Sequence, residues 1–287
     1  MTLFKNKVKL KANAKININL YVGEKRADGY HELDGIMQSV SLCDTITVKK
    51  AKKTVLKCSK PYLSGEDNLG FKAATLFFNE TKINGGAHIY INKKIPEAAG
   101  LGGGSADAAA VLLALNKLYH TDLKTKKLEK MAAVLGADVP FFIRGGTMRA
   151  KGIGEILEEL PPLKKGYFVI AKTGQKPSTK EMYRQLDTKE HTPIDVNQSV
   201  EYIKNNDFKG LNSLLLNSFN EVYPDKTLEN RLKEFSPLGV GLSGSGPTYF
   251  AAFETKADAK KCLKALKREN ILCFLAYPLE KGIIFKN

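Results

Sequence analysis

The stretch Ile95–Ala110 reads IPEAAGLGGGSADAAA and is the part of the chain that best defines its fold. Four of the five residues from Gly100 to Gly104 are glycine, and an alanine-rich helical pattern follows at once. Because alternating residues at 87–91 precede the glycines, the order is strand, glycine loop and helix. Glycine lets backbone N–H groups crowd around an anion, and the N-terminal end of a helix directs its positive dipole there. The stretch therefore predicts a phosphate-binding loop.

This loop differs from the two commonest phosphate loops. A Walker A loop continues from its last glycine into Lys-Ser or Lys-Thr, whereas Ser105 and Ala106 follow Gly104. A dinucleotide fingerprint needs a further glycine where Ser105 or Asp107 stands. A flexible turn before a helix is the alternative interpretation. A capping hydroxyl and an acid in the first turn favour a built anion site.

Length and composition limit the class of protein. The 287 residues are enough for one large domain or two modest ones, and 43% of them are hydrophobic. Met1–Lys7 has no apolar run, and no stretch approaches the roughly 18 apolar residues of a membrane span. We therefore expect a cytoplasmic protein with no membrane partner. The four cysteines and four histidines have no metal-ligand spacing, so we expect reduced thiols and no structural metal site.

The net charge is +15, from 45 Lys+Arg against 30 Asp+Glu. This charge suits nucleic acid, or a polyanionic small substrate with ATP, and an evenly spread surface charge is the third interpretation. No single stripe of sequence interleaves the lysines with aromatic residues. We therefore predict a small-molecule partner and no nucleic acid.

Residues 14–22 alternate strictly, which predicts a half-buried strand. Its apolar face is Ile16, Ile18, Leu20 and Val22, and its other face, which is either solvated or functional, is Lys15, Asn17, Asn19 and Tyr21. A loop is expected at 23–29. Further strands are expected at 36–42, 45–50, 54–58 and 87–93, and helices at 68–80, 105–119 and 125–135.

The segment Leu160–Gly166 contains two prolines and is typical of a domain joint. Beyond it we expect a strand at 167–171, helical segments from 179 to 235, a strand at 247–253, a helix at 257–269 and strands at 271–276 and 282–285. This mixed order predicts two α+β domains, residues 1–162 and 163–287, with a cleft between them.

One acid stands between a glycine and an apolar run, in the segment Gly136–Phe142. A carboxylate at such a place is either a helix N-cap or a buried functional acid. By this pattern alone, Asp138 is better interpreted as a cap.

Several segments together resemble the GHMP kinases, the family of galactose, homoserine, mevalonate and phosphomevalonate kinases. Pro96–Ala110 resembles their Pro-x-x-x-Gly-Leu-Gly-Gly-Gly-Ser-Ser-Asp-Ala-Ala-Ala loop, with Ala106 in place of the second serine. Ala14–Asn17 resembles their first motif and Leu242–Thr248 their third. Arg26–Leu33 is very similar to the octapeptide of the branch that phosphorylates 4-diphosphocytidyl-2-C-methyl-D-erythritol.

The resemblance runs from about residue 12 to residue 253 and implies a two-domain α+β fold. Its N-terminal domain would be ribosomal S5 domain 2-like and its C-terminal domain ferredoxin-like. The implied reaction is ATP-dependent phosphorylation of the 2-hydroxyl of 4-diphosphocytidyl-2-C-methyl-D-erythritol, in the non-mevalonate route to isoprenoids. Mg²⁺ is expected with ATP, and no protein ligand of the metal is predicted.

The resemblance also implies roles for individual residues. Asp138 would accept the proton of the acceptor hydroxyl, and Lys15 would lie beside it and polarise the attacking oxygen. Asn17 shares the strand face of Lys15 and would bind the same group. The nucleotide would contact two residues of the adenine pocket and the loop itself: Asn68, Lys93, Pro96, Glu97, Ala98, Ala99, Gly100, Leu101, Gly102, Gly103, Gly104, Ser105 and Ala106. Ser105 would contact phosphate or Mg²⁺.

Cytosine has a face for stacking and an edge for hydrogen bonding. The resemblance implies that Tyr30 stacks on the face, that His31 binds the edge, and that Tyr183 completes an aromatic sandwich. Thr179 belongs to the same segment as Tyr183 and is expected to contact the substrate. A core aromatic is the other interpretation of Tyr183.

Two other functions stay open at this point. One is a GHMP kinase with a different small alcohol or sugar as acceptor, against which the Tyr30-His31 segment argues. The other is an RNA-binding protein without enzymatic activity, which the net charge and the S5-like domain suggest.

Overall fold

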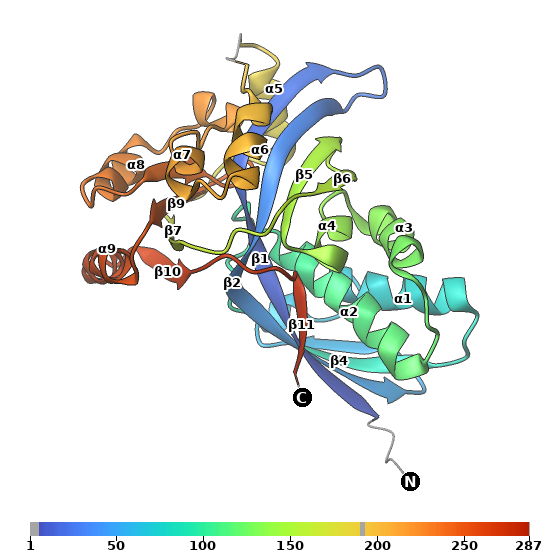
Figure 1. The fold of residues 1–287 in the computed structure, drawn as a ribbon. Coiled ribbons are helices and arrows are strands. Elements are labelled where there is room, and N and C mark those ends of the chain that lie inside the picture. The colour runs from blue at the N-terminus through green and yellow to red at the C-terminus, as the bar shows by residue number, and fades with distance from the viewer. Residues whose placement is uncertain (1–5, 190–192, 287) are drawn as a thin grey trace.

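The structure, a computed structural model, describes residues 6–189 and 193–286, which form two β-sheets with helices packed against them (Figure 1). The first sheet has seven strands, in the order β11-β1-β2-β4-β3, with β5 paired to β2 and β6 paired to β5. These strands are β1 (Lys7–Lys25), β2 (His31–Ala51), β3 (Val55–Cys58), β4 (Gly86–Asn92), β5 (Thr147–Gly152), β6 (Ile156–Glu159) and β11 (Ile283–Lys286).

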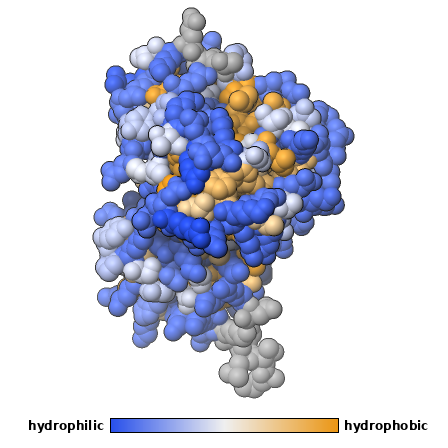
Figure 2. Space-filling view, turned by 90° about the vertical axis from the view of Figure 1, so that its left-hand side faces the viewer, coloured by the Kyte–Doolittle hydropathy of each residue, from blue (hydrophilic) through white to orange (hydrophobic). Residues whose placement is uncertain are grey.

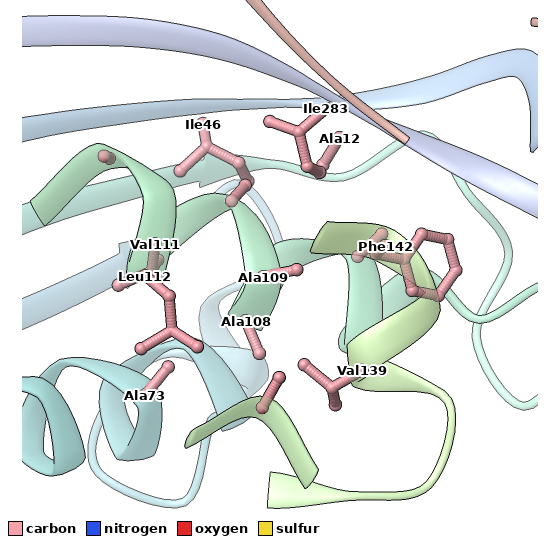
Figure 3. Packing of buried hydrophobic residues seen from close by; sticks show 14 of the residues in the cluster. Ala12, Ile46, Ala73, Ala108, Ala109, Val111, Leu112, Val139, Phe142 and Ile283 are labelled. Carbon is pink, nitrogen blue, oxygen red and sulfur yellow. The ribbon is translucent and has the colours of Figure 1, made fainter. Parts of the chain in front are cut away.

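Four helices gather on one side of the first sheet (Figure 1): α1 (Leu69–Thr81), α2 (Gly103–Tyr119), α3 (Thr125–Leu135) and α4 (Val139–Arg144). The alanines of α2 are fully buried, and their small size lets the helix lie close to the sheet and to its neighbours. Figure 3 shows this packing, with Ala108 and Ala109 of α2 among side chains of α1, α4 and the sheet. The start of α2, which carries the glycine loop, is thereby held rigidly.

The second sheet is antiparallel and has the order β10-β7-β9-β8. Its strands are β7 (Tyr167–Lys172), β8 (Gly239–Leu242), β9 (Thr248–Phe253) and β10 (Leu272–Ala276). The accompanying helices are α5 (Thr179–Leu186), α6 (Val196–Lys204), α7 (Phe208–Asn212), α8 (Lys226–Lys233) and α9 (Lys256–Arg268), with short 3₁₀ turns at Pro61–Leu63 (η1) and Ser218–Glu221 (η2). This strand order is the ferredoxin-like order, so the predicted fold class is confirmed.

The long strands β1 and β2 contribute to both cores. Ile16 and Ile18 of β1 pack with Phe168 and Phe250 of the second sheet, whereas Leu10 lies in the core under α2. The polar face of β1 is buried as well, because the turn after β8 and helix α6 cover it. A solvated face is therefore excluded for Lys15 and Asn17, and a functional one remains.

The predicted helices agree with α1, α2 and α3 to within two residues. The strands expected at 36–42 and 45–50 are one strand, because a bulge beside Asn13 and Ala14 of β1 lets the pairing continue. The loop expected at 23–29 starts later, since β1 continues to Lys25. The short helix α4 and strands β5, β6 and β8 were not predicted.

The division at residues 162 and 163 stays a prediction as a whole, but the last strand departs from it. β11, which was expected in the second domain, pairs with β1 at the edge of the first sheet (Figure 1). The reason is apolar burial, because Ile283 lies in the core under α2 and Phe285 packs against that core.

Candidate active site

The candidate catalytic pair comes from β1 and the turn before α4. Lys15 Nζ lies 3.8 Å from Asp138 Oδ2 and donates a hydrogen bond of 2.5 Å to Asn17 Oδ1. Lys15 and Asn17 share a strand face because they are two residues apart. The Lys15 side chain is 5% exposed and that of Asp138 is 41% exposed. The carboxylate is thus accessible to a ligand, while the buried ammonium lies beside it.

Asp138 occupies the N-cap position of α4 but accepts no capping hydrogen bond. The second helical residue is Pro140, which has no N–H group for a cap to satisfy. The carboxylate is directed at Lys15 instead. The interpretation of Asp138 as a cap is therefore wrong, and a functional acid fits the geometry.

The glycine loop has the geometry of an anion cradle. Gly102 is the N-cap of α2 in a left-handed conformation, and no side chain caps this helix end. The N–H groups of the first turn are thus available to an anion, with the helix dipole behind them. Gly104 is exposed, and a Cβ at this position would meet no atom within 4 Å. A Cβ at Gly103 would instead lie 3.0 Å from the side chain of Ile95.

Three sequence motifs meet at Ser243. Its hydroxyl donates to the carbonyl of Gly100 at 2.9 Å and lies 3.3 Å from the backbone N of Asn17. The next amide, that of Gly244, donates to Asn17 Oδ1 at 2.9 Å. A Cβ at Gly100 would collide with the Ser243 carbonyl, so glycine is required there. The third motif therefore walls the site beside the phosphate loop, as predicted.

Lys93, which is predicted to contact the nucleotide, has its ammonium engaged within the protein. Its ammonium is buried between Asp44 Oδ2 at 2.5 Å and Asp107 Oδ2 at 2.8 Å. All three side chains are less than 5% exposed. Asp44 Oδ1 also accepts the backbone N–H groups of Lys94 and Ile95 at 2.5 and 2.9 Å. This buried cluster ties the entry of the glycine loop to the first turn of α2.

Two further loop predictions are modified by the structure. The Asn68 side chain caps α1 at Gly70 and donates to the carbonyl of Leu63, so its amide is engaged within the protein. Glu97 accepts hydrogen bonds from Lys60 at 2.5 Å and from Tyr62 at 2.9 Å. Sequence reasoning missed this contact, because Lys60 precedes the 3₁₀ turn η1, Tyr62 belongs to it, and this segment has no motif of its own.

The remaining residues of the loop differ in burial and in their contacts. Ala99 and Leu101 are buried, and the Leu101 carbonyl accepts the amide of Lys15 at 3.0 Å. Ala106 is fully buried in the core under the sheet, so its methyl group fits where the family pattern has a serine. Ser105 is half-buried, and its hydroxyl makes no hydrogen bond with another residue of the described chain. Pro96 is half-buried and Ala98 is exposed.

A cavity of about 630 Å³ connects the catalytic pair with the glycine loop. Its lining includes Lys15, Asp138, Gly102 and Gly244. It also includes residues that sequence reasoning missed, from the loop after β7 and the turn after β5: Lys172, Gln175, Lys176, Ile153 and Gly154. Burial lowers the pKa of Lys176.

A second cavity, of about 700 Å³, adjoins the first and shares Thr179 and Tyr183 with it. Tyr30 and His31 line it as well, so the structure brings together all four predicted residues. Thr179 Oγ1 lies 3.2 Å from Ser245 Oγ, which links this wall to the third motif.

The predicted aromatic sandwich is arranged differently in this structure. His31 stacks on Tyr183 with ring centroids 4.8 Å apart, and its Nε2 lies 2.5 Å from Asp187 Oδ1. The imidazole thus covers one face of Tyr183, while Tyr30 lines the same cavity and is 59% exposed. Burial, with a smaller effect of Asp138, raises the pKa of Tyr183 to about 12. Burial acts to raise the pKa of Asp187, but the contacts with His31 and Lys25 together outweigh it, and the pKa falls below its usual range.

Comparison with known proteins shows the family of this chain. The family model for the GHMP kinase N-terminal domain matches residues 68–146, and the model for the C-terminal domain matches residues 199–272. A 4-diphosphocytidyl-2-C-methyl-D-erythritol kinase of Alkaliphilus metalliredigens is 39% identical over 90% of this chain and 92% of its own. The chain belongs to the GHMP kinase family.

Other relatives of this GHMP kinase carry the same name. One from Clostridium botulinum is 39% identical over 93% of this chain and 98% of its own. A crystal structure of a 4-(cytidine 5'-diphospho)-2C-methyl-D-erythritol kinase superposes with a TM-score of 0.77 at 33% identity, covering 93% and 98% of the two chains. The homoserine kinase of Cytophaga hutchinsonii also has a TM-score of 0.77, but at 18% identity it shares only the fold. The chain is an ATP-dependent small-molecule kinase.

Two absences concern the described residues alone. Residues 6–189 and 193–286 hold no cluster of three His, Cys, Asp or Glu side chains that could bind a metal ion. Within the same ranges, none of the helices has the length and apolar character needed to cross a bilayer. All four cysteines are free thiols, as expected.

Proposed function

We propose that this kinase transfers the γ-phosphoryl group of ATP to the 2-hydroxyl of 4-diphosphocytidyl-2-C-methyl-D-erythritol. The observation that carries the proposal is the Lys15–Asp138 pair, which opens into the same cavity as the glycine loop. The names of the relatives support this acceptor. The adjoining cavity, with its aromatic and histidine walls, supports a nucleobase-bearing substrate.

The nucleotide phosphates would lie against the amides of the first turn of α2. Gly104 leaves open space there, and the dipole of a 17-residue helix favours negative charge at that end. The buried cluster of Asp44, Lys93 and Asp107 would hold the loop in position. The chain would thus supply binding and orientation, which dominate catalysis of phosphoryl transfer.

In the reaction, Asp138 would accept the proton of the acceptor hydroxyl. The hydroxyl oxygen would form a bond to the γ-phosphorus, and the bond from phosphorus to the bridging oxygen would break, leaving ADP. Lys15, held by Asn17, would stabilise negative charge on the attacking oxygen. Among residues 6–189 and 193–286, Asp138 is the only carboxylate within ion-pair distance of Lys15.

The cytosine ring would occupy the second cavity. Tyr30 is exposed at the rim and would close over one face of the base, with the His31–Tyr183 stack as the opposite wall. Asp187 holds the imidazole by Nε2, which leaves Nδ1 for a polar atom of the base edge. Thr179 lies where the two cavities meet and would contact the diphosphate.

We propose Mg²⁺ as the second cofactor, because it neutralises charge on the triphosphate during transfer. The protein would contribute few ligands to such an ion. Ser105 has an unengaged hydroxyl, and the described residues hold no group of three His, Cys, Asp or Glu side chains that could bind a metal. The nucleotide phosphates would then be the main ligands. A cytoplasmic location stays a prediction of the sequence.

The direct test is the release of ADP by the purified protein with each of four acceptors. We expect turnover with the diphosphocytidyl substrate and none above background with galactose, homoserine or mevalonate. Turnover with one of the other three alone would assign a different acceptor within the same family.

A further inference from the structure

One face of the first sheet carries no helix. Along its strands, residues alternate between a set packed under α1 and α2 and a set directed to the opposite side. We call the outward set the open face, and every member of it is exposed or half-buried. Its members are Lys7, Lys9, Lys11, Thr45, Thr47, Lys49, Val55, Lys57, His88, Tyr90, Asn92, Ile284 and Lys286.

The open face is strongly basic. It contains six lysines and no acidic residue. None of these six lysines forms an ion pair with a residue of the described chain. The nearby acid of β2, Asp44, is directed to the helix side and is buried against Lys93. Seen from the left of Figure 1, the lower half of the molecule, where these strands lie, is largely hydrophilic (Figure 2).

The strand register sets like charges directly opposite one another. Lys9 of β1 faces Lys286 of β11, and Lys7 faces Lys49 of β2. Like charges at paired positions of a sheet destabilise it. This face contains no carboxylate that would offset the repulsion. The arrangement is costly in the free protein and becomes favourable when an anionic partner covers it.

Aromatic rings lie among these lysines. One cross-strand row runs Lys286, Lys9, Thr47, Tyr90, Lys57, each residue paired with the next. The next row pairs Lys7, Lys49, His88 and Val55. Tyr90 is 47% exposed, and His88 lies two residues away on the same face. Each exposed ring therefore has a lysine on an adjacent strand.

We propose that the open face binds single-stranded RNA. The lysines neutralise phosphates, and Tyr90 and His88 offer flat rings on which bases stack. Thr45, Thr47 and Asn92 supply hydroxyl and amide groups for the 2'-hydroxyls. Only Val55 and Ile284 are aliphatic, which leaves too little apolar surface for insertion into a lipid bilayer.

This proposal revises the expectation that nucleic acid is not a partner. The sequence alone shows no basic stripe with aromatic residues. The residues of the open face lie on five strands, and only the strand register brings them together. None of the open-face residues lines either cavity of the candidate active site. The proposal is therefore independent of the proposed reaction.

The test is a fluorescence-anisotropy titration of the full chain with a labelled 12-nucleotide single-stranded RNA. We expect the logarithm of the association constant to fall linearly with the logarithm of the salt concentration, with a slope of about −0.7 per neutralised phosphate. Saturating ATP should not compete. No binding at 50 µM protein in 50 mM salt, or displacement by ATP, would overturn the proposal.

Variants and competitors locate and identify the site. K9Q/K49Q/K57Q should weaken binding at least tenfold, while the matched control K260Q/K264Q/K267Q on α9, which also removes three charges, should not. Tyr90→Ala should weaken it about fivefold or more, unlike Tyr223→Ala, whose ring is equally exposed. Circular dichroism and the melting temperature verify folding. Equal losses in target and control variants, equal affinity for DNA of the same sequence, or preference for anionic phosphatidylserine vesicles would each contradict the assignment.

Discussion

The ammonium of Lys15 lies 3.8 Å from the carboxylate of Asp138 and 2.5 Å from the side-chain oxygen of Asn17. A strand near the start of the chain and the turn before α4 thus bring these two side chains together. The ammonium is buried and the carboxylate is accessible, which suits a fixed charge beside a proton acceptor. The predictions that follow test this pair and its surroundings.

Asp138→Asn keeps the size of the side chain but removes its ability to accept a proton. We expect kcat to fall about 10²- to 10⁴-fold, with the KM for ATP nearly unchanged, because the glycine loop is intact. Steady-state kinetics with Asp122→Asn, an exposed loop acid, provide the control. Near-normal turnover of Asp138→Asn would mean that this acid is not the base.

Gly104→Val places a Cβ and two methyl groups in open space in front of α2. The protein itself meets no new contact, so the circular-dichroism spectrum should be unchanged. The Kd for ATP should rise at least tenfold, because the side chain fills the place of a phosphate. Gly103→Val is the less clean variant, since its Cβ would press on Ile95 and disturb the fold. An unaltered ATP titration of Gly104→Val would refute the cradle.

Tyr30→Ala removes the exposed ring at the rim of the second cavity. Loss of a stacking ring costs about 1–3 kcal/mol for a nucleobase, so the KM for the cytidyl substrate should rise several-fold or more. The KM for ATP should stay within twofold. Tyr30→Phe is the matched control and should behave like the native enzyme. An equal rise of both KM values would show that Tyr30 does not distinguish the two substrates.

Asp107→Asn tests the buried cluster through pH. Burial raises the pKa of Asp107 well above its usual range, against the opposing effect of Lys93. Over this pH range the carboxyl of Asp107 keeps its proton in the folded state and loses it in the unfolded chain. The free energy of unfolding therefore falls as pH rises from the ordinary carboxyl pKa toward the raised pKa of the folded state. Asparagine is neutral throughout.

Urea denaturation between about pH 4 and pH 8 measures the effect. The difference in unfolding free energy should shift in favour of Asp107→Asn as pH rises, because the buried carboxyl resists losing its proton. Asp122→Asn should show no such trend. A difference that is constant with pH would show that Asp107 titrates alike in both states.

The sequence predicts what depends on neighbours in the chain. The glycine loop, the strand face of Lys15 and Asn17 and the helices under the sheet all arise from short patterns, and the structure contains each of them. The pairing of Lys15 with Asp138 came from the family resemblance, because no local pattern joins β1 to α4.

Partners far apart in the chain account for the rest. The family resemblance implies that Lys93 contacts adenine, whereas in the structure its ammonium pairs with Asp44 and Asp107. These two partners belong to a distant strand and to a helix, so no local pattern indicates them. The stacking of His31 on Tyr183 likewise joins β2 to α5. The open face depends on strand register, which composition and motifs leave undetermined.

The edge strand β11 has a consequence for how the chain folds during synthesis. It follows every other described element, yet Ile283 and Phe285 complete the core under α2 beside β1. Until β11 emerges from the ribosome, β1 exposes unpaired backbone groups along that edge, where another chain could add a strand. Most strands of the first sheet are synthesised early, but the sheet is complete only after β11 has been synthesised. A fragment ending near residue 162 would therefore lack the edge strand β11. We expect the first sheet to fold stably only as part of the whole kinase.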